Sequence, residues 1–464
     1  MLTHSAKTKL REIVGPAHYF DSPEDLICHS YDATLYQALP EAVVYPGSVE
    51  EVAAIMRLAN DERFAVTPRG AGTGLSGGSL PVAGGVVMVL TRLNRIVQIN
   101  TDDLYAIVEP GAITADLAAA AGRHRLLYPP DPASQSVSTV GGNVAENAGG
   151  LRGLKYGVTK HYVLALEIVT PLGEALHTGS TTVKCVTGYD LTQLIVGCEG
   201  TLGVVTKIWC KLVPMPEHKE SMLAIFADVD DAARTVAAII RSGVIPATLE
   251  FLDHATINAV EDFKKIGLPR QAEAILLIET DGRKAAAQAE AEQVVAVCCE
   301  NRAQSVQKAA NEAERTKLWQ ARRGALSSLA RLRPTTILED ATVPRSRVPD
   351  MVRGVREIAQ RHRITIGNFG HAGDGNLHPT VLTDVRDKDE FARAEKAIEE
   401  IFDLALSLGG TLSGEHGIGT AKAPFLMREI GQVGLDVMRS IKRALDPNNV
   451  LNPGKMLLDG PRGT

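Results

Sequence analysis

Three histidines and a glutamate lie in two short glycine-rich segments of the C-terminal half of the chain. The segments are Gly370–His378, which reads GHAGDGNLH, and Ser413–Gly417, which reads SGEHG. Two imidazoles and a carboxylate are a common ligand set for a divalent transition metal that keeps open coordination positions. An imidazole that remains outside the ligand set can act as a general base. The residue types therefore indicate metal-assisted acid–base chemistry.

The spacing of these residues predicts how they are brought together. Asp374 and Gly375 lie between His371 and His378 and are typical of a tight turn, so we expect a hairpin that places both imidazoles on neighbouring strands. A single histidine is more often a structural or surface residue. Two histidines that flank one turn, with Glu415 in a second glycine-bracketed loop, favour a site.

A second glycine-rich loop lies far upstream, at Pro68–Gly78 (PRGAGTGLSGG), after an expected strand at Phe64–Thr67. Successive glycines free backbone amides to bind an anion such as a pyrophosphate. A nucleotide-triphosphate loop would end in Gly-Lys-Ser/Thr, which is absent. A Rossmann fingerprint would open a helix, and no helical pattern follows. A flavin pyrophosphate loop and a plain glycine-rich turn remain as interpretations of this loop alone.

Further stretches of the N-terminal half offer hydroxyls, amides and exposed backbone to a ligand. They read PPDPAS at 129–134, STVGGN at 138–143, NAGG at 147–150 and EGTLGVVT at 199–206. Four such stretches in one domain exceed what turns alone require. Because residues 129–157 show little periodicity, we expect a long functional loop there.

Composition excludes several classes of protein. With 464 residues the chain is long enough for two or three domains, and its 45% hydrophobic and 22% charged residues are ordinary for a globular protein. The net charge of −6 gives no reason to expect nucleic acid as a partner. No apolar run approaches the roughly 18 residues of a membrane span, and the N-terminus lacks a secretory signal, so we expect a cytoplasmic protein.

The cysteine pattern bears on the route of electrons. The six cysteines form no CxxC pair, which argues against an iron–sulfur cluster held by this chain alone. If electrons leave the protein through iron–sulfur centres, another subunit must carry those centres.

The chain divides near Val213–Pro216, a proline-rich stretch that predicts a domain boundary. After a helical lead-in, the first part alternates short strands and helices around the glycine-rich loops. The second part repeats strand–helix–strand units. We expect an antiparallel sheet with helices on one face there, which is an α+β layer.

These motifs together resemble the FAD-linked oxidases of the vanillyl-alcohol-oxidase (PCMH) type, and within them the glycolate oxidase D subunit and D-lactate dehydrogenase group. The resemblance covers about residues 30–457. It implies an α+β protein with a two-subdomain PCMH-type FAD-binding domain over 1–216 and a cap or substrate domain over 217–464. The motifs that carry it are PRGAGTGLSGG, PPDPASQSVSTVGGNVAENAGG, GYDLTQLIVGCEGTLGVVT, GHAGDGNLH, SGEHGIGTAK and DPNNVLNPGK.

The resemblance also implies where FAD binds. Some relatives attach FAD through a histidine of the glycine-rich loop, and Thr73 stands at that place here, so we expect non-covalent FAD. The residues expected at the FAD site are Arg69, Gly70, Ala71, Gly72, Thr73, Gly74, Pro130, Ser134, Thr139, Gly141, Gly142, Asn143, Asn147, Glu199, Gly203, Val205 and Asn452.

The resemblance carries catalytic roles to the C-terminal motifs. His371, His378 and Glu415 would bind Zn²⁺, Mn²⁺ or Fe²⁺, and His416 would be the general base. Arg322 aligns with the arginine that binds the substrate carboxylate, although a solvated helix surface is the alternative for it. Oxidation of a 2-hydroxy acid would remove the hydroxyl proton and pass a hydride from Cα to flavin N5.

The chain departs from the hydroxyglutarate enzymes of the family where those bind a distal carboxylate. Leu326, Leu338 and Thr380 stand at these places, so a small monocarboxylate, D-lactate or glycolate, is expected rather than D-2-hydroxyglutarate. D-2-hydroxyglutarate dehydrogenase is the alternative within the family, and a metal-dependent hydrolase and a non-catalytic flavin subunit are alternatives of other classes. No nicotinamide site is evident. The expected electron acceptor is an electron-transfer flavoprotein, an iron–sulfur subunit or a quinone.

Overall fold

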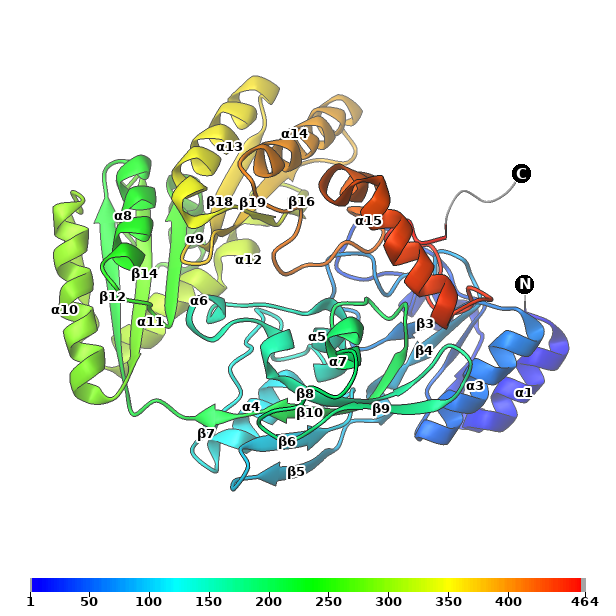
Figure 1. The fold of residues 1–464 in the computed structure, drawn as a ribbon. Coiled ribbons are helices and arrows are strands. Elements are labelled where there is room, and N and C mark those ends of the chain that lie inside the picture. The colour runs from blue at the N-terminus through cyan, green and yellow to red at the C-terminus, as the bar shows by residue number, and fades with distance from the viewer. Residues whose placement is uncertain (1, 460–464) are drawn as a thin grey trace. The chain divides into compact units, whose positions relative to one another are not determined.

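The computed structural model describes residues 2–459, which form two compact units (Figure 1). Residues 1 and 460–464 of the predicted domains lie outside the described residues. The chain passes from unit 1 to unit 2 at Met215, next to the expected boundary. Neither unit is one continuous stretch of sequence. The segment Gly150–Gly157 belongs to unit 2, and the chain from Glu415 onwards belongs to unit 1.

Unit 1 begins with a sheet of short apolar strands. Its strand order is β1-β2-β4-β3, in which β2, β4 and β3 run parallel and β1 is antiparallel to β2. The helices α1 and α3 pack apolar side chains against it, and α2 precedes β2. The bounds are α1 (His4–Val14), β1 (Tyr19–Phe20), α2 (Pro23–Cys28), β2 (Ala42–Val44), α3 (Val49–Glu62), β3 (Val66–Arg69) and β4 (Val86–Val89).

A second, antiparallel sheet of unit 1 has the order β5-β6-β10-β8-β9. Its β8–β9 hairpin turns at residues 170–174. A short pair, β7 with β11, lies before the passage into unit 2. The bounds are β5 (Ile96–Asn100), β6 (Tyr105–Val108), α4 (Thr114–Gly122), β7 (Leu126–Leu127), α5 (Val140–Glu146), β8 (Val163–Val169), β9 (Ala175–Gly179), α7 (Leu191–Ile195), β10 (Val204–Lys211) and β11 (Val213–Pro214).

The expectation of one long loop over 129–157 is wrong, because this segment contains the helices α5 and α6 (Gly153–Tyr156). Thr139 caps α5 by accepting a hydrogen bond from the Gly142 amide at 3.2 Å. Asn147 ends α5 in a left-handed conformation, φ 52°. Glycines inside so short a helix hide its periodicity, because they lower helix propensity and carry no apolar side chain.

The C-terminal segment of unit 1 completes its first sheet. Helix α15 (Ala423–Leu445) is interrupted at Gly431, where φ is 67° and ψ is 174°. The chain then returns to β3, where the Val66 amide donates to the Val450 carbonyl and the Asn452 amide donates to the Val66 carbonyl. The C-terminal segment therefore stabilises β3, the strand that precedes the glycine-rich loop.

Unit 2 is built on an antiparallel sheet of order β15-β12-β14-β13-β18-β19-β16, with β17 also paired to β19. The strand bounds are β12 (His218–Phe226), β13 (Thr248–Asp253), β14 (Ala274–Gly282), β15 (Ser305–Lys308), β16 (Thr335–Leu338), β17 (Ala341–Thr342), β18 (Thr365–His371) and β19 (Asn376–Thr383). The helix bounds are α8 (Val229–Arg241), α9 (His254–Lys264), α10 (Lys284–Glu300), α11 (Glu312–Arg323), α12 (Ala325–Leu329), α13 (Val348–His362) and α14 (Lys388–Ser407).

Helices cover both faces of this sheet, so the expectation of helices on one face is wrong. Alternate side chains of β14 enter two apolar clusters, Leu276 with α8, α10, α13 and α14, and Leu277 with α9, α11 and α12. Phe369 of β18 belongs to the second cluster. The sheet is therefore apolar on both sides, which hides the alternation that marks a one-sided sheet. None of the described helices combines the length and apolar character needed to cross a membrane.

Candidate functional site

The glycine-rich loop of unit 1 follows β3 and is shaped by glycines that a side chain would disturb. Gly72 and Gly77 have φ of 71° and 77°, in the left-handed region. A Cβ at Gly70 would lie 2.3 Å from Thr139 Oγ1, and one at Gly72 would lie 2.1 Å from Arg69 Nη2. The loop therefore packs closely on the start of α5 and on the buried Arg69.

Several residues expected at the FAD site use their side chains within the protein. Asn143 Nδ2 donates to Thr114 Oγ1 at 2.7 Å, and Asn147 Oδ1 accepts from the Lys160 amide at 2.8 Å. Asn452 Nδ2 donates to the carbonyls of Gly78 and Glu199 at 2.9 and 2.8 Å. These side chains hold the loops in place.

The remaining expected FAD residues lie in unit 1 at the same loops. Ala71 is exposed, whereas Gly72, Thr73 and Gly74 are half-buried, so this part of the loop reaches the surface. The other members differ in burial as follows: Pro130, Gly203 and Val205 are buried, and Ser134, Gly141 and Gly142 are half-buried. A Cβ at Gly141 would lie 2.5 Å from Pro110 Cβ.

Two buried carboxyls beside this loop form a feature that we did not predict as a pair. Glu146 Oε1 accepts from Ser76 Oγ at 3.0 Å. Glu199 accepts from the amides of Ile418 and Gly419 at 2.8 and 2.6 Å. Burial raises the pKa of Glu146 well above its ordinary value, and the neighbouring Glu199 adds to that rise. Burial also raises the pKa of Glu199. Glu199 thus fixes the backbone that follows His416.

Glu415 and His416 begin the last segment of unit 1. His416 Nε2 lies 3.8 Å from Glu415 Oε1. A Cβ at Gly149 would lie 2.7 Å from Glu415 Oε2, so the glycine makes room for this carboxylate. The position of Glu415 thus depends on Gly149, and the backbone after His416 is fixed by Glu199.

In unit 2 the predicted hairpin is confirmed. Strands β18 and β19 pair with His371 opposite Asn376 and Phe369 opposite His378. The rings of His371 and His378 have centroids 5.2 Å apart, and their ligand nitrogens lie within 4.8 Å of one another. The two imidazoles are therefore near neighbours and candidates for ligands of one ion.

Asp340, between β16 and β17, is a further carboxylate in this region that we did not predict for the site. Its oxygen and a ring nitrogen of His378 lie within 4.8 Å of each other. Asp340 Oδ2 also accepts from Ser413 Oγ at 2.7 Å and from the Gly414 amide at 2.9 Å. It therefore anchors the residues that precede Glu415 in the chain.

Glu250 on β13 was also missed, and it connects two residues that we predicted separately. Its Oε1 lies 2.7 Å from His371 Nδ1, and its Oε2 accepts from Arg322 Nε. The side chain of Glu250 is fully buried. Burial acts to raise the pKa of Glu250, but the interactions with His371 and Arg322 outweigh burial and leave the pKa below its ordinary value.

Arg322 does not lie on a solvated helix surface, which was the alternative interpretation of this residue. Arg322 is buried, whereas Arg323 is exposed. The guanidinium carbon of Arg322 lies 4.8 Å from the centroid of Phe369, and Phe369 lies 5.6 Å from the centroid of His378. Arg322, Glu250, Phe369, His371 and His378 thus form one network within unit 2, which we call the Glu250 network.

Comparison with protein families identifies the cofactor of this chain. Residues 40–179 match the family model of an FAD binding domain, and residues 215–456 match the C-terminal domain of FAD linked oxidases. The chain belongs to the FAD-linked oxidase family. It is accordingly a flavin oxidoreductase with FAD as cofactor.

Relatives of this FAD-linked oxidase align with all or nearly all of its length. It is 50% identical over 463 residues to the glycolate oxidase subunit GlcD of Bacillus subtilis, covering 100% of this chain and 98% of the relative. The GlcD protein of Escherichia coli K12 is 40% identical, with 96% and 89% covered. A D-lactate dehydrogenase of Anaerostipes hadrus is 36% identical, with 92% of each protein covered.

Solved structures share the fold of this FAD-linked oxidase. p-Cresol methylhydroxylase with bound substrate aligns with a TM-score of 0.80 at 18% identity, over 97% of this chain and 96% of that one. An alkyldihydroxyacetonephosphate synthase aligns with a TM-score of 0.76 at 19% identity, over 98% and 85%. These likenesses confirm the expected α+β, PCMH-type architecture.

The residues of unit 1 fit FAD. Any Cβ at Gly70 or Gly72 would clash with Thr139 or Arg69, so the loop can follow this path only with glycines, and the buried Arg69 adds positive charge beside it. A pyrophosphate needs such a cradle of backbone amides and positive charge.

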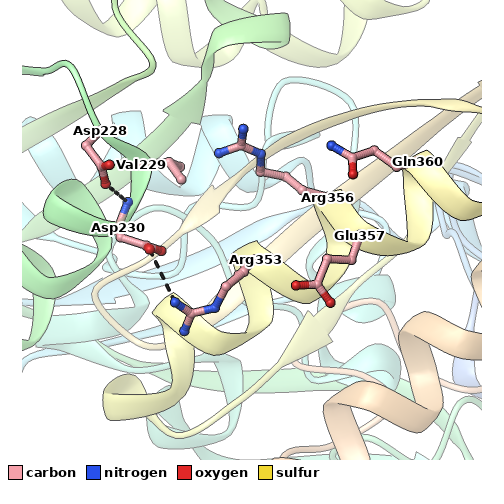
Figure 2. A pocket seen from close by; sticks show the side chains of 7 residues that line it. All are labelled: Asp228, Val229, Asp230, Arg353, Arg356, Glu357 and Gln360. Carbon is pink, nitrogen blue, oxygen red and sulfur yellow. Dashed lines mark hydrogen bonds and ion pairs between the residues drawn. The ribbon is translucent and has the colours of Figure 1, made fainter.

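Unit 2 also has a surface pocket, and none of the residues that line it was predicted to belong to a site. Figure 2 shows it between the start of α8 and helix α13. The volume of the pocket is about 220 Å³. Two interactions join its lining residues: Asp230 pairs with Arg353 at 3.2 Å, and Asp228 Oδ1 accepts from the Asp230 amide at 2.7 Å (Figure 2). We interpret this pocket as an ordinary solvated surface, since Asp230 is already paired with Arg353 and the other lining residues on α13 are exposed.

Proposed function

We propose that this FAD-linked oxidase is a divalent-metal-dependent dehydrogenase of a small D-2-hydroxy monocarboxylate, D-lactate or glycolate, which it converts to the 2-oxo acid. The Glu250 network carries the proposal, because it joins imidazoles suited to a metal with an arginine suited to a carboxylate. The names of the relatives, a glycolate oxidase subunit and a D-lactate dehydrogenase, support the same substrate class.

In this proposal His371, His378 and Glu415 hold the metal. The two histidines are cross-strand neighbours of one hairpin. Glu415 follows Gly414 directly in the chain. Within unit 2, the Gly414 amide donates a hydrogen bond to Asp340. The donor set of two nitrogens and a carboxylate oxygen suits Zn²⁺, Mn²⁺ and Fe²⁺.

The protein's own groups would then bind the substrate and take its proton. Arg322 would bind the carboxylate with the terminal nitrogens of its guanidinium. His416 would accept the hydroxyl proton. A bound divalent ion would lower the pKa of the substrate hydroxyl, and bound FAD would take the hydride from Cα.

A small monocarboxylate is favoured over a dicarboxylate by three side chains of unit 2. Leu326 and Leu338 pack against the apolar cluster of α9, α11 and α12. Thr380 is buried and donates its hydroxyl to the His378 carbonyl at 3.1 Å. None of these three side chains offers a positive charge to a second carboxylate.

The proposed electron acceptor is another protein or a quinone. The B. subtilis and E. coli relatives are named as subunits, which favours a partner protein. We propose an electron-transfer flavoprotein or an iron–sulfur subunit, because the cysteines of this chain form no cluster motif.

An anaerobic visible spectrum of the purified, FAD-loaded protein tests the proposal. D-lactate, L-lactate, glycolate and D-2-hydroxyglutarate are added separately, before and after removal of metal with a chelator and its return as Zn²⁺, Mn²⁺ or Fe²⁺. Bleaching of the flavin by D-lactate or glycolate, lost with the chelator and restored by one ion, is the expected result.

Other outcomes would replace the proposal. Bleaching by D-2-hydroxyglutarate alone would make the chain a dicarboxylate enzyme. Bleaching that survives the chelator would remove the metal from the proposal. A flavin that no hydroxy acid reduces would favour a non-catalytic flavin subunit.

A further inference from the structure

Glu250 lies on β13 next to β18, and both of its oxygens are engaged by residues with proposed roles. Oε1 lies 2.7 Å from His371 Nδ1 and Oε2 accepts from Arg322 Nε. The three side chains are 0%, 7% and 7% exposed for Glu250, His371 and Arg322. A carboxylate without solvent is stable only with such partners.

The contact with His371 determines which ring nitrogen can bind a metal. A carboxylate accepts hydrogen bonds, so the proton of a neutral His371 lies on Nδ1. The lone pair is then on Nε2. A metal-binding histidine commonly donates its other ring N–H to a carboxylate, which fixes both tautomer and ring orientation.

The contact with Arg322 orients the guanidinium. Glu250 binds the Nε side of the plane, and Phe369 lies against its face at 4.8 Å. The terminal nitrogens of Arg322 thereby keep a fixed direction. A carboxylate substrate is recognised best by a planar fork whose direction is set before binding.

We infer that Glu250 is the positioning residue that aligns the metal-binding nitrogen of His371 with the carboxylate-binding fork of Arg322. This inference rests on the proposed function. It adds that one carboxylate sets the geometry of metal and substrate together, so that its loss weakens the binding of both.

The same sheet offers a matched control. Glu279 on the adjacent strand β14 is also buried, and it accepts from Ser221 Oγ at 2.8 Å, Trp319 Nε1 at 3.1 Å and Lys219 Nζ at 3.0 Å. Glu279→Gln therefore removes a buried charge from the same core. It leaves the bonds of Glu250 in place.

The test compares FAD-loaded wild type, Glu250→Gln, Glu250→Asp and Glu279→Gln, with flavin content and melting temperature recorded for each. Mn²⁺ binding to metal-stripped protein is measured by calorimetry. The KM and kcat for D-lactate or glycolate are measured with a dye acceptor. The tautomer of His371 is read from ¹⁵N-histidine NMR, with the signal assigned by its loss in His371→Gln.

If Glu250 positions both groups, Glu250→Gln weakens Mn²⁺ binding about 10- to 100-fold. It also raises KM more than it lowers kcat and shifts the His371 signal away from the Nδ1–H form. Glu250→Asp, which keeps the charge but is one methylene shorter, shows a smaller change of the same kind. Glu279→Gln matches wild type in all three measurements.

The inference is overturned if Glu250→Gln and Glu279→Gln behave alike, because Glu250 would then only stabilise the fold. Should Glu250→Gln fail to fold, Glu250→Asp decides by the same readouts. If wild type binds no Mn²⁺ at all, the metal-binding part of the proposed function is wrong. The His371 tautomer and the KM then decide whether Glu250 positions these side chains.

Discussion

The guanidinium of Arg322 lies over the ring of Phe369, with its central carbon 4.8 Å from the ring centroid. Phe369 is on β18, two residues before His371, so the strand that carries a proposed metal ligand also supports the proposed substrate arginine. A cation over an aromatic face is stabilised by about 0.5–2 kcal/mol, more when solvent is excluded.

We expect Phe369→Leu to raise the KM for the hydroxy acid by roughly 2- to 30-fold, the factor that corresponds to the loss of that cation–π stabilisation. Steady-state kinetics with a dye acceptor provide the measurement. The control is Phe263→Leu, because Phe263 stacks under Arg331 at 4.2 Å and is 39% exposed. An equal rise of KM in both variants would contradict the role of the Phe369 ring.

Arg322→Lys keeps the positive charge but removes the planar fork. We expect kcat/KM to fall roughly 10- to 150-fold, which corresponds to one lost hydrogen bond to a charged group. Arg323→Lys, at the exposed neighbouring position, is the control and should stay near wild type. If Arg323→Lys lost as much activity as Arg322→Lys, the solvated arginine would be the functional one.

The buried carboxyl of Glu146 predicts a pH dependence of stability. Its pKa is raised in the folded protein, chiefly by burial, so the native state keeps a proton that the unfolded chain releases near pH 4.5. The free energy of unfolding then falls as pH rises from about 4.5 to the folded pKa, because the native state binds more protons in that window.

Glu146→Gln removes this titration while keeping an acceptor for Ser76. We therefore expect the variant to match wild type below about pH 4.5 and to gain stability over it as pH rises. Denaturant unfolding between pH 4 and 8 gives the difference. A difference that shrinks with rising pH would mean that the pKa of Glu146 is not raised.

The cysteines should divide by burial in their reaction with a thiol reagent. Cys28, Cys185 and Cys299 are exposed, whereas Cys198, Cys210 and Cys298 are buried. Burial raises the pKa of Cys210 and Cys298 to about 12, so almost no thiolate is present at pH 8. Alkylation followed by peptide mass spectrometry should label the first group in native protein and the second only after denaturation.

The turn between the two hairpin histidines depends on Gly375, which has φ of 88°. A Cβ there would lie 2.0 Å from the Val343 carbonyl oxygen, a backbone atom that cannot turn away. We expect Gly375→Ala to lower the free energy of unfolding by at least about 1–3 kcal/mol. Gly409→Ala controls for backbone strain alone, since φ is 77° there and no atom lies within 4 Å of the added Cβ. Similar melting temperatures for the two variants would rule out the clash.

Local signals in the sequence were enough to predict the hairpin and the glycine-rich loop. Asp374 and Gly375 mark a turn whatever surrounds them, and the glycines at 70–78 indicate a loop whether or not that loop binds a ligand. The roles proposed for His371, His378, Glu415, His416 and Arg322 stay predictions that the experiments above address.

Other features could not be read from local signals. Helix α5 was missed because its residues, among them Gly141 and Gly142, are poor helix formers, and its stability comes from tertiary packing and the Thr139 cap. Glu250 could have been noticed as a charge between apolar neighbours in the middle of the strand Thr248–Asp253. Its partners lie 72 and 121 residues away, and their approach is a property of the folded sheet.

The segmental make-up of the two units has a consequence for biosynthesis and for protein engineering. Because β3 bonds to Val450 and Asn452, the first sheet cannot be completed until nearly the whole chain has left the ribosome. Cutting the chain at Met215 would separate Glu199 from the Ile418 and Gly419 amides, and Gly150–Gly157 from the rest of unit 2. Neither unit can be exchanged between relatives as a single stretch of sequence, so a chimera with a new substrate specificity has to graft at least two segments together.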